Sequence, residues 1–239
     1  MISFIYSSLV IKNSTLEIKS AFMIVHNLGK ENSILNQFIS EIRDSQVQKD
    51  AMRFRRNIER IGEVLGYELS KELTYNPAMV KTPLGVKEMN LNRDSLVICS
   101  ILRAGLPLHQ GLLNYFDTAE NGFISAFRKH EGNSDNFEVI VKYFAAPSLE
   151  GKILVLTDPM LATGRTLENV LLTLKDHGTP TAIHIISVIG SQQGIEYLDN
   201  IFPGHTHLWI AAIDQELNSR GYIVPGIGDA GDLAFGEKL

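Results

Sequence analysis

Short apolar runs alternate with segments of helical periodicity through most of the chain after Asp94. The runs are largely continuous and do not alternate with polar residues, which is typical of parallel strands buried on both faces. They occupy residues 95–101, 122–127, 153–156, 181–190 and 206–214. Helical patterns fill the intervals at 106–116, 167–178 and 191–202. This alternation predicts an α/β fold with a parallel, doubly wound sheet flanked by helices, and Asp214 is expected to end its last strand.

The segment before Asp94 has a different pattern. From Ser33 to Leu73 the periodicity is helical. The apolar stripe of the first helix consists of Ile34, Leu35, Phe38, Ile39 and Ile42. A second helix is expected from about Asp50 to Tyr67, and its arginines are scattered round it, which favours solvated or subunit-facing charges over an anion site. Residues 75–89, with two prolines and a glycine, predict a hairpin or an irregular stretch.

Residues 23–239 are expected to form a single domain, since a chain of 239 residues suits one core with an appendage. Residues 1–22 form an N-terminal extension of uncertain status. A genuine extension and a start at Met23 both remain open. The apolar beginning has no basic region before it and is interrupted by Lys12, which argues against a signal peptide. No run is long enough for a transmembrane span, and a cytoplasmic location is expected.

Charge and cysteine content narrow the function further. The formal net charge of −5 argues against nonspecific nucleic-acid binding as the main role. The single cysteine, Cys99, lies in an apolar run, where a buried structural thiol is expected in place of a nucleophile. His205 and His207 are close in sequence, but no third ligand accompanies them, so no metal site built from protein side chains is predicted.

The segment KILVLTDPMLATGRTL, residues 152–167, predicts a strand, a turn and a helix N-terminus. Small and hydroxyl-bearing residues fill the turn: Ala162, Thr163, Gly164 and Thr166. Unpaired N–H groups of the first helical turn and the helix dipole favour an anion there, and Gly164 lets the backbone approach it closely. The segment lacks the Gly-Lys-Ser/Thr of a P-loop and the glycine pattern of a dinucleotide fold. An ordinary strand-to-helix connection remains the alternative.

Three further features suggest what the anion belongs to. Asp158 follows directly after the strand, and a carboxylate there can accept hydrogen bonds from a vicinal diol, so the ligand suggested is a ribose 5-phosphate. Arg103 follows another apolar run, where ligands bind in open α/β sheets, and its planar fork suits a polyphosphate. Glycines in the tail at 221–231, interleaved with residues such as Ile223, predict a backbone that lines a small flat ligand.

Three blocks of the chain together resemble the bacterial uracil phosphoribosyltransferases, a type I phosphoribosyltransferase family. The blocks are ILRAGL (101–106), DPMLATG (158–164) and DQELNSRGYIVPGIGDAGD (214–232). The resemblance implies transfer of the phosphoribosyl group of 5-phosphoribosyl 1-pyrophosphate (PRPP) to uracil, giving UMP and pyrophosphate in pyrimidine salvage. It also implies Mg²⁺ bound mainly through PRPP, a hood formed by N- and C-terminal segments, and a homo-oligomer, dimer or tetramer. Neither a nucleic-acid nor a membrane partner is expected.

The same resemblance assigns roles to individual residues. The residues expected to bind PRPP are Arg103, Arg128, Asp158, Pro159, Met160, Leu161, Ala162, Thr163, Gly164, Arg165, Thr166 and Asp229. Those expected to bind uracil are Ile223, Gly228, Asp229 and Ala230. Arg103 and Asp229 are the expected catalytic residues, Arg103 at the pyrophosphate and Asp229 between the base and PRPP.

Two departures from the family pattern leave roles open. Arg165 stands where close relatives often have Gly, and it either adds a phosphate ligand or points to solvent. The paired aromatics at 143–144 are followed by two alanines, where the family usually has a Lys soon after. The contribution of the expected flap at 129–150 is therefore open.

Two other functions remain to be weighed against the uracil enzyme. A regulatory protein could use the same fold to sense PRPP or nucleotides and bind RNA, although the acidic balance and the intact tail weigh against it. A phosphoribosyltransferase for another base is the second alternative. Orotate would require an additional cation near Gly228, and the tail shows none there.

Overall fold

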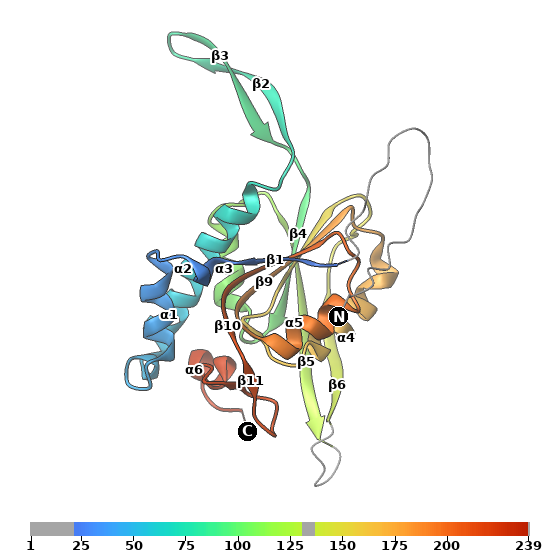
Figure 1. The fold of residues 1–239 in the computed structure, drawn as a ribbon. Helices are drawn as coiled ribbons and strands as arrows, with labels where there is room; N and C mark the ends of the chain where they lie inside the picture. Colours follow the sequence, from blue (N-terminus) through green and yellow to red (C-terminus); the bar gives the residue numbers. More distant parts are fainter. Residues whose placement is uncertain (1–21, 131–136, 239) are drawn as a thin grey trace, which may run out of the picture.

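An eight-stranded sheet forms the centre of the computed structural model, which describes residues 22–130 and 137–238 (Figure 1). The strand order is β1-β10-β9-β7-β4-β5-β6, with the short β8 beside β9. The strands are β1 (Ile24–Asn27), β4 (Leu96–Leu102), β5 (Glu120–His130), β6 (Phe137–Ala145), β7 (Ile153–Thr157), β8 (Met160–Leu161), β9 (Ala182–Ser191) and β10 (Thr206–Asp214). All pairs are parallel except β5 with β6. The predicted, mostly parallel α/β sheet is thus confirmed.

Both outer strands differ from the prediction. β6 is antiparallel because only residues 131–136 separate it from β5, and a parallel neighbour needs a crossover of roughly a dozen residues or more. At the other edge, β1 pairs with β10 through Ile24–Asn27, a segment without a strand signal of its own. Its place is decided by the unpaired edge of β10, which it covers.

Helices cover both faces of the sheet, as a doubly wound arrangement requires. α2 (Ala51–Ser70) and α3 (Leu106–Leu113) lie on one face, and α4 (Arg165–Leu174) and α5 (Gln192–Asp199) lie on the other (Figure 1). Successive residues of β4 alternate between the two cores: Ile98 packs with α2 and α3, whereas Val97 and Cys99 pack on the opposite side. Cys99 is fully buried, which confirms the expected structural thiol.

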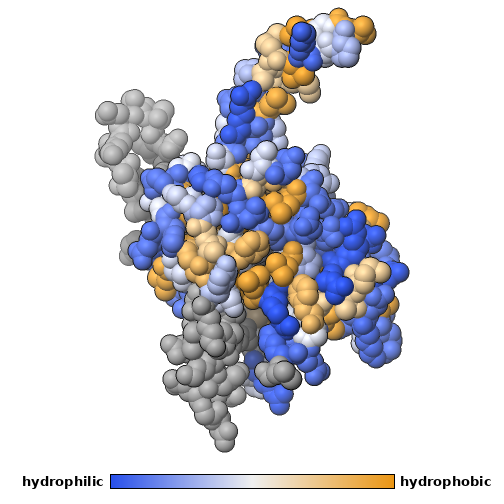
Figure 2. All heavy atoms as spheres, turned by 180° about the vertical axis from the view of Figure 1, so that it is seen from behind, coloured by the Kyte–Doolittle hydropathy of each residue, from blue (hydrophilic) through white to orange (hydrophobic). Residues whose placement is uncertain are grey.

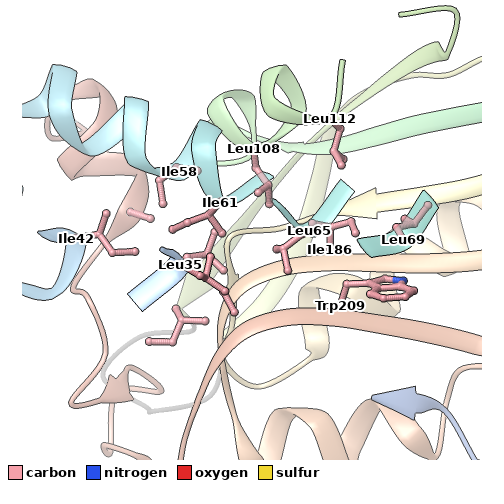
Figure 3. Close-up of a cluster of buried hydrophobic side chains, with 14 of the residues drawn as sticks. Leu35, Ile42, Ile58, Ile61, Leu65, Leu69, Leu108, Leu112, Ile186 and Trp209 are labelled. Atoms are coloured by element: carbon pink, nitrogen blue, oxygen red, sulfur yellow. The ribbon is translucent and has the colours of Figure 1, made fainter. Parts of the chain in front are cut away.

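The stripe of α2 makes most of the first core. Ile58, Ile61, Leu65 and Leu69 follow one another along the helix and face Leu108 of α3 and the sheet residues Ile186 and Trp209 (Figure 3). Asp50 caps α2 by accepting hydrogen bonds from the backbone N–H groups of Met52 and Arg53.

α1 (Leu35–Arg43) is the first of the two predicted N-terminal helices and is shorter than its pattern. Leu35 and Ile42 are buried, but Ile34, expected in the apolar stripe, is 62% exposed. The physical reason is its position at the N-cap, which places its side chain beyond the end of the buried stripe that begins at Leu35. The 3-10 turns η1 (Leu28–Lys30), η2 (Val47–Lys49) and η3 (Lys175–His177) adjoin these helices or follow α4.

Segments from both ends of the described chain meet above the carboxyl ends of the strands. β10, the last strand of the central sheet in chain order, ends at Asp214 as predicted. After it come β11 (Glu216–Leu217) and β12 (Ile223–Val224), which form a separate two-stranded sheet, and then α6 (Ala230–Phe235). α6 packs on α2, where the Arg55 guanidinium donates to the Ala234 carbonyl at 2.6 Å. This arrangement corresponds to the expected hood.

The hairpin of β2 (Tyr75–Thr82) and β3 (Gly85–Asn92) stands away from the rest of the molecule (Figures 1 and 2). It confirms the hairpin alternative at 75–89 and forms a separate two-stranded sheet. Large apolar side chains are exposed along it: Tyr75, Met79, Leu84, Val86, Met89 and Leu91. Within the described residues, no helix combines the length and apolar character that crossing a bilayer needs.

Candidate active site

The turn from Asp158 to Gly164 connects the central strand β7 to α4. β7 ends at Thr157, and the Asp158 carboxylate accepts a hydrogen bond from the Met160 backbone N–H at 3.2 Å. Gly164 is the N-cap of α4 and has no side chain to cap the first turn. A helix N-terminus without a side-chain cap attracts an anion through its dipole, which is the property on which the predicted phosphate turn depends.

Gly164 is required here for a reason that the sequence did not show. Its φ is +77°, and a Cβ at this position would lie 2.9 Å from Tyr197 Cδ1 and 3.0 Å from Leu198 Cδ2. The missing side chain thus faces α5. The glycine lets two helices approach each other, in addition to any close approach of a ligand.

The β9–α5 junction supports this turn from behind. Ser191 Oγ donates to the Ala162 carbonyl at 2.6 Å and accepts from the Gly194 N–H at 2.9 Å. A Cβ on Gly194 would lie 2.1 Å from that same carbonyl oxygen. Ser191 and Gly194 therefore shape the turn. Sequence reasoning missed them because they lie in a different strand–helix unit.

Arg103 follows β4 at the same edge of the sheet, after a cis peptide bond with Leu102. Its Nη2 donates to Asp232 Oδ1 at 3.1 Å and to the Gly236 carbonyl at 3.0 Å. Its Nε is buried and has no hydrogen-bond partner among the described residues. A buried unpaired donor is energetically unfavourable, so this nitrogen indicates an acceptor that belongs in the site.

The tail reaches both of the other blocks. The Ala230 N–H points to Met160 Sδ at 3.4 Å, and Asp232 pairs with Arg103. Asp229 caps α6, since its Oδ1 accepts from the backbone N–H groups of residues 231 and 232 at 2.9 and 3.0 Å. Three segments that are distant in sequence are thus joined at one place.

Gly228 lies in the open part of the tail. It is exposed, its φ is +84°, and the nearest atoms to a Cβ there would be Leu233 Cδ1 at 3.7 Å and Gln48 Oε1 at 4.0 Å. Ile223 and Ala230, by contrast, are buried. The four residues expected at the base therefore offer mainly backbone groups and one carboxylate.

Two expected arginines remain less well placed. Arg128 lies in β5 opposite Val139 of β6, but its side chain is outside the described residues. Arg165 is the first residue of α4, is exposed, and lies near enough to Tyr197 for its charge to influence that phenol. The tip of the expected flap, residues 131–136, also lies outside the described part.

A buried polar network lies directly beneath the turn. Ser100 Oγ is 2.5 Å from Thr157 Oγ1 and 2.6 Å from His109 Nδ1, and His109 Nε2 is 2.7 Å from Asn121 Oδ1. Burial lowers the pKa of His109, against the opposing effect of Asn121, so the ring is neutral and donates from Nε2. This network ties β4, β5, β7 and α3 together behind the site.

The mostly parallel sheet covered by helices on both faces, with a small-residue turn after its central strand, has the fold of the type I phosphoribosyltransferases. The profile of the family described as uracil phosphoribosyltransferase matches residues 30–237, so the chain belongs to that family. These enzymes transfer the phosphoribosyl group of PRPP to uracil and are pentosyl-transferring glycosyltransferases.

Similar proteins agree with this assignment. The chain is 51% identical over 217 residues to a uracil phosphoribosyltransferase of Porphyromonas gingivalis, covering 91% of this chain and 100% of the relative. It is 39% identical over 209 residues to a uracil phosphoribosyltransferase of Methanothermobacter thermautotrophicus, covering 87% and 94% respectively. A solved structure of an Aquifex aeolicus protein matches with a TM-score of 0.80 and 30% identity, covering 90% of this chain and 100% of that one.

Proposed function

We propose that the chain joins uracil to PRPP in the site formed by the 158–166 turn, Arg103 and the tail at 223–232. The observation that carries the proposal is the convergence of these segments through the Ala230–Met160 and Asp232–Arg103 contacts. The product is UMP and the leaving group is pyrophosphate. Pyrimidine salvage in the cytoplasm is the setting that this reaction suggests.

The turn is assigned to the ribose 5-phosphate of PRPP. The backbone from Ala162 to Thr166 and the hydroxyls of its threonines hold the phosphate, helped by the α4 dipole. Asp158 faces the ribose hydroxyls, and Pro159, Met160 and Leu161 complete the turn. Arg165 is the first residue of α4 and is assigned to the same phosphate because its guanidinium can add a charge-assisted hydrogen bond at the helix N-terminus.

Arg103 and Arg128 are assigned to the pyrophosphate. The buried Nε of Arg103 supports this role, since a phosphate oxygen would supply the acceptor that it lacks among the described residues. When PRPP binds, the guanidinium exchanges some of its bonding with Asp232 and Gly236 for the pyrophosphate. The Asp232 contact keeps the guanidinium near its working position until then.

Uracil is assigned to the backbone around Ile223, Gly228 and Ala230. The base has two carbonyl acceptors and N–H donors, which backbone amides and carbonyls can match. Cytosine would place an amino group against a donor, and this mismatch would leave buried groups unpaired. Asp229 is the N-cap of α6 and is assigned to the position between the base and PRPP.

The reaction breaks the bond from the anomeric carbon to pyrophosphate, which leaves with the bonding electrons, and forms the bond to the uracil nitrogen. The proton of that nitrogen passes to water or to the leaving pyrophosphate. Positive charge develops on the ribose as pyrophosphate leaves, in an oxocarbenium-like transition state. No covalent nucleophile on the protein is required. The protein aligns the base with the sugar and stabilises the leaving group through Arg103 and Arg128.

Mg²⁺ fits this site as a partner of PRPP. In residues 22–130 and 137–238, no three His, Cys, Asp or Glu residues are grouped so as to hold a metal ion. The ion would therefore be held mainly by PRPP oxygens and water, with Asp158 as the nearest carboxylate of the turn. When bound, it neutralises charge on the leaving pyrophosphate.

A base panel tests the function directly. The purified protein is incubated with PRPP and Mg²⁺ and with uracil, cytosine, orotate or hypoxanthine in turn, and pyrophosphate release is followed. Release with uracil alone is expected, and EDTA should abolish it. No release with uracil, or faster release with another base, would overturn the proposal.

We also propose that the protein is a homo-oligomer in which the β2–β3 hairpin packs on a second copy. Isolated two-stranded hairpins are marginally stable in water. This one presents Met79, Leu84 and Val86 at 67%, 100% and 64% exposure. Figure 2 shows apolar surface along a projection clear of the body, where another subunit can reach it. A second copy is the occupant that can bury both hairpins at once.

A further inference from the structure

Arg43 and Asp214 form a two-fold hydrogen-bonded ion pair between the end of α1 and the end of β10. Arg43 Nη1 donates to Asp214 Oδ2 at 2.9 Å, and its Nη2 donates to Oδ1 at 2.8 Å. The side chains are only 25% and 10% exposed. Parallel, bidentate bonds of this kind fix orientation more firmly than a single contact does.

The same two side chains hold the backbone of Gly226 from both of its polar ends. The Gly226 N–H donates to Asp214 Oδ2 at 2.9 Å, and its carbonyl accepts from Arg43 Nη1 at 3.2 Å. Gly226 has a φ of +62°, and a Cβ there would lie 2.1 Å from the Ile223 carbonyl oxygen. The turn between Ile223 and Gly228 is therefore tight and is clamped at its middle.

The residues after α1 reach the same turn. Gln48 donates through Nε2 to the carbonyls of Ile42 and Arg43, both at 3.2 Å. This bonding directs its Oε1 toward Gly228, where a Cβ would lie 4.0 Å away. The C-terminal end of α1 thus borders the tail where the base is assigned.

We propose that Arg43 and Asp214 are positioning residues that set the base-binding turn and so determine uracil affinity without contacting PRPP. This inference rests on the proposed assignment of the tail to uracil. Backbone groups that read a base must be held to within about 0.5 Å to bond well. If the Arg43–Asp214 pair is lost, the Gly226 peptide is no longer held in place. The positions of the backbone groups of Ile223 and Gly228 then change as well.

The ion pair persists at neutral pH. Burial by itself raises the pKa of Asp214, but hydrogen bonds from Arg43 and the Gly226 N–H, together with the Arg43 charge, hold it below its ordinary value. Asp214 is therefore ionised under assay conditions, and the clamp is fully formed when uracil binds.

The test compares the two substrates in the variants Arg43→Gln and Asp214→Asn. KM for uracil should rise about tenfold in each, roughly the effect of one hydrogen bond's free energy. KM for PRPP, and its Kd measured by calorimetry without uracil, should stay within about twofold. Arg43→Lys should restore part of the uracil affinity, because a lysine keeps the charge and one contact.

Arg53→Gln is the matched control. Arg53 also pairs with a carboxylate across two helices, at 3.1 Å from Glu41 Oε2, but it has no hydrogen bond or ion pair to the tail among the described residues. In this variant, KM for uracil and KM for PRPP should both be unchanged. If Arg43→Gln does not fold, Arg43→Lys decides by the same comparison.

An unchanged KM for uracil in folded variants would overturn the inference, as would an equal rise in both constants, which indicates general damage. Failure of the proposed function itself is distinguishable, because the wild-type protein would then release no pyrophosphate with uracil.

Discussion

At Gly164 a single hydrogen atom in place of a side chain serves both the turn and its support. The positive φ and the contact with α5 are separate requirements, and either one disfavours any other residue. The contributions of the positive φ and of the contact with α5 can therefore be measured separately.

Gly164→Ala should lower the free energy of unfolding by about 2–4 kcal/mol, because backbone strain adds to the clash with Tyr197 and Leu198. Gly151→Ala is the control: its φ of +70° is similar, but nothing lies within 4 Å of the added Cβ. That variant should lose only about 1 kcal/mol. Urea denaturation measures both. Equal losses would show that packing on α5 contributes nothing.

Arg103→Ala should reduce kcat by orders of magnitude with little change in thermal stability. The side chain is 37% exposed and makes one ion pair, so its removal leaves the core intact. Steady-state assays and thermal unfolding check the two parts of this prediction. Near-normal kinetics would remove Arg103 from the pyrophosphate site.

Cys99 should resist thiol reagents in the native protein. Burial raises the pKa of its thiol to about 12, so almost no thiolate is present at neutral pH. Reaction with an aromatic disulfide reagent should be complete in denaturant and negligible without it. Rapid native labelling would mean that the β4 region opens.

At the scale of elements, β1 is attached to the sheet edge through aromatic rings. His26 stacks on Trp209 with ring centroids 3.7 Å apart, and its Nε2 lies 3.0 Å from His207 Nδ1. Trp209 Nε1 donates to His184 Nδ1 at 3.1 Å, so that nitrogen must be unprotonated. Three neighbouring strands, β1, β10 and β9, therefore carry three histidines that bond best when neutral.

This cluster should make stability fall at mildly acidic pH. Burial, then the charges of His207 and His26, lowers the pKa of His184 to about 3. Burial also lowers the pKa values of His26 and His207, although Glu72 opposes the effect. The folded state binds fewer protons than the unfolded state, so the stability present above about pH 6.5 is lost as pH falls toward the folded pKa values, by up to ~1.4 kcal/mol per pH unit and group.

Thermal unfolding between about pH 7.5 and about pH 5.5 measures this loss. His26→Phe keeps a ring against Trp209 but cannot be protonated, so its melting temperature should fall less over the same range. An identical slope in the variant would show that His26 does not take part.

At the scale of the whole molecule, the β2–β3 hairpin is not packed against the hydrophobic core of its own chain. Met79→Lys together with Val86→Lys should shift the protein to a smaller species in light scattering after size exclusion, because charges replace the apolar contacts between copies. Met52→Lys, at a 64% exposed position on α2, is the control and should not change the mass. An unchanged mass in the hairpin variant would place the interface elsewhere.

The sequence by itself determined the elements whose signals are local. Buried strands such as 153–157 require continuous apolar residues, and the turn after them carries its small residues and Asp158 in one uninterrupted stretch. The resemblance of three short blocks was enough to identify the family, and the profile over 30–237 confirms it. Local pattern also predicted the hairpin.

Tertiary structure alone decided what depends on contacts between distant segments. Edge pairing placed β1 and β6, and packing on α5 explains Gly164. The supports of the site, Ser191 beneath the turn and Arg43 at the tail, act through side-chain and backbone bonds to residues far away in the chain. Such bonds leave no spacing or periodicity in a sequence. The sequence alone does not distinguish an arginine that holds a turn from an arginine that faces solvent.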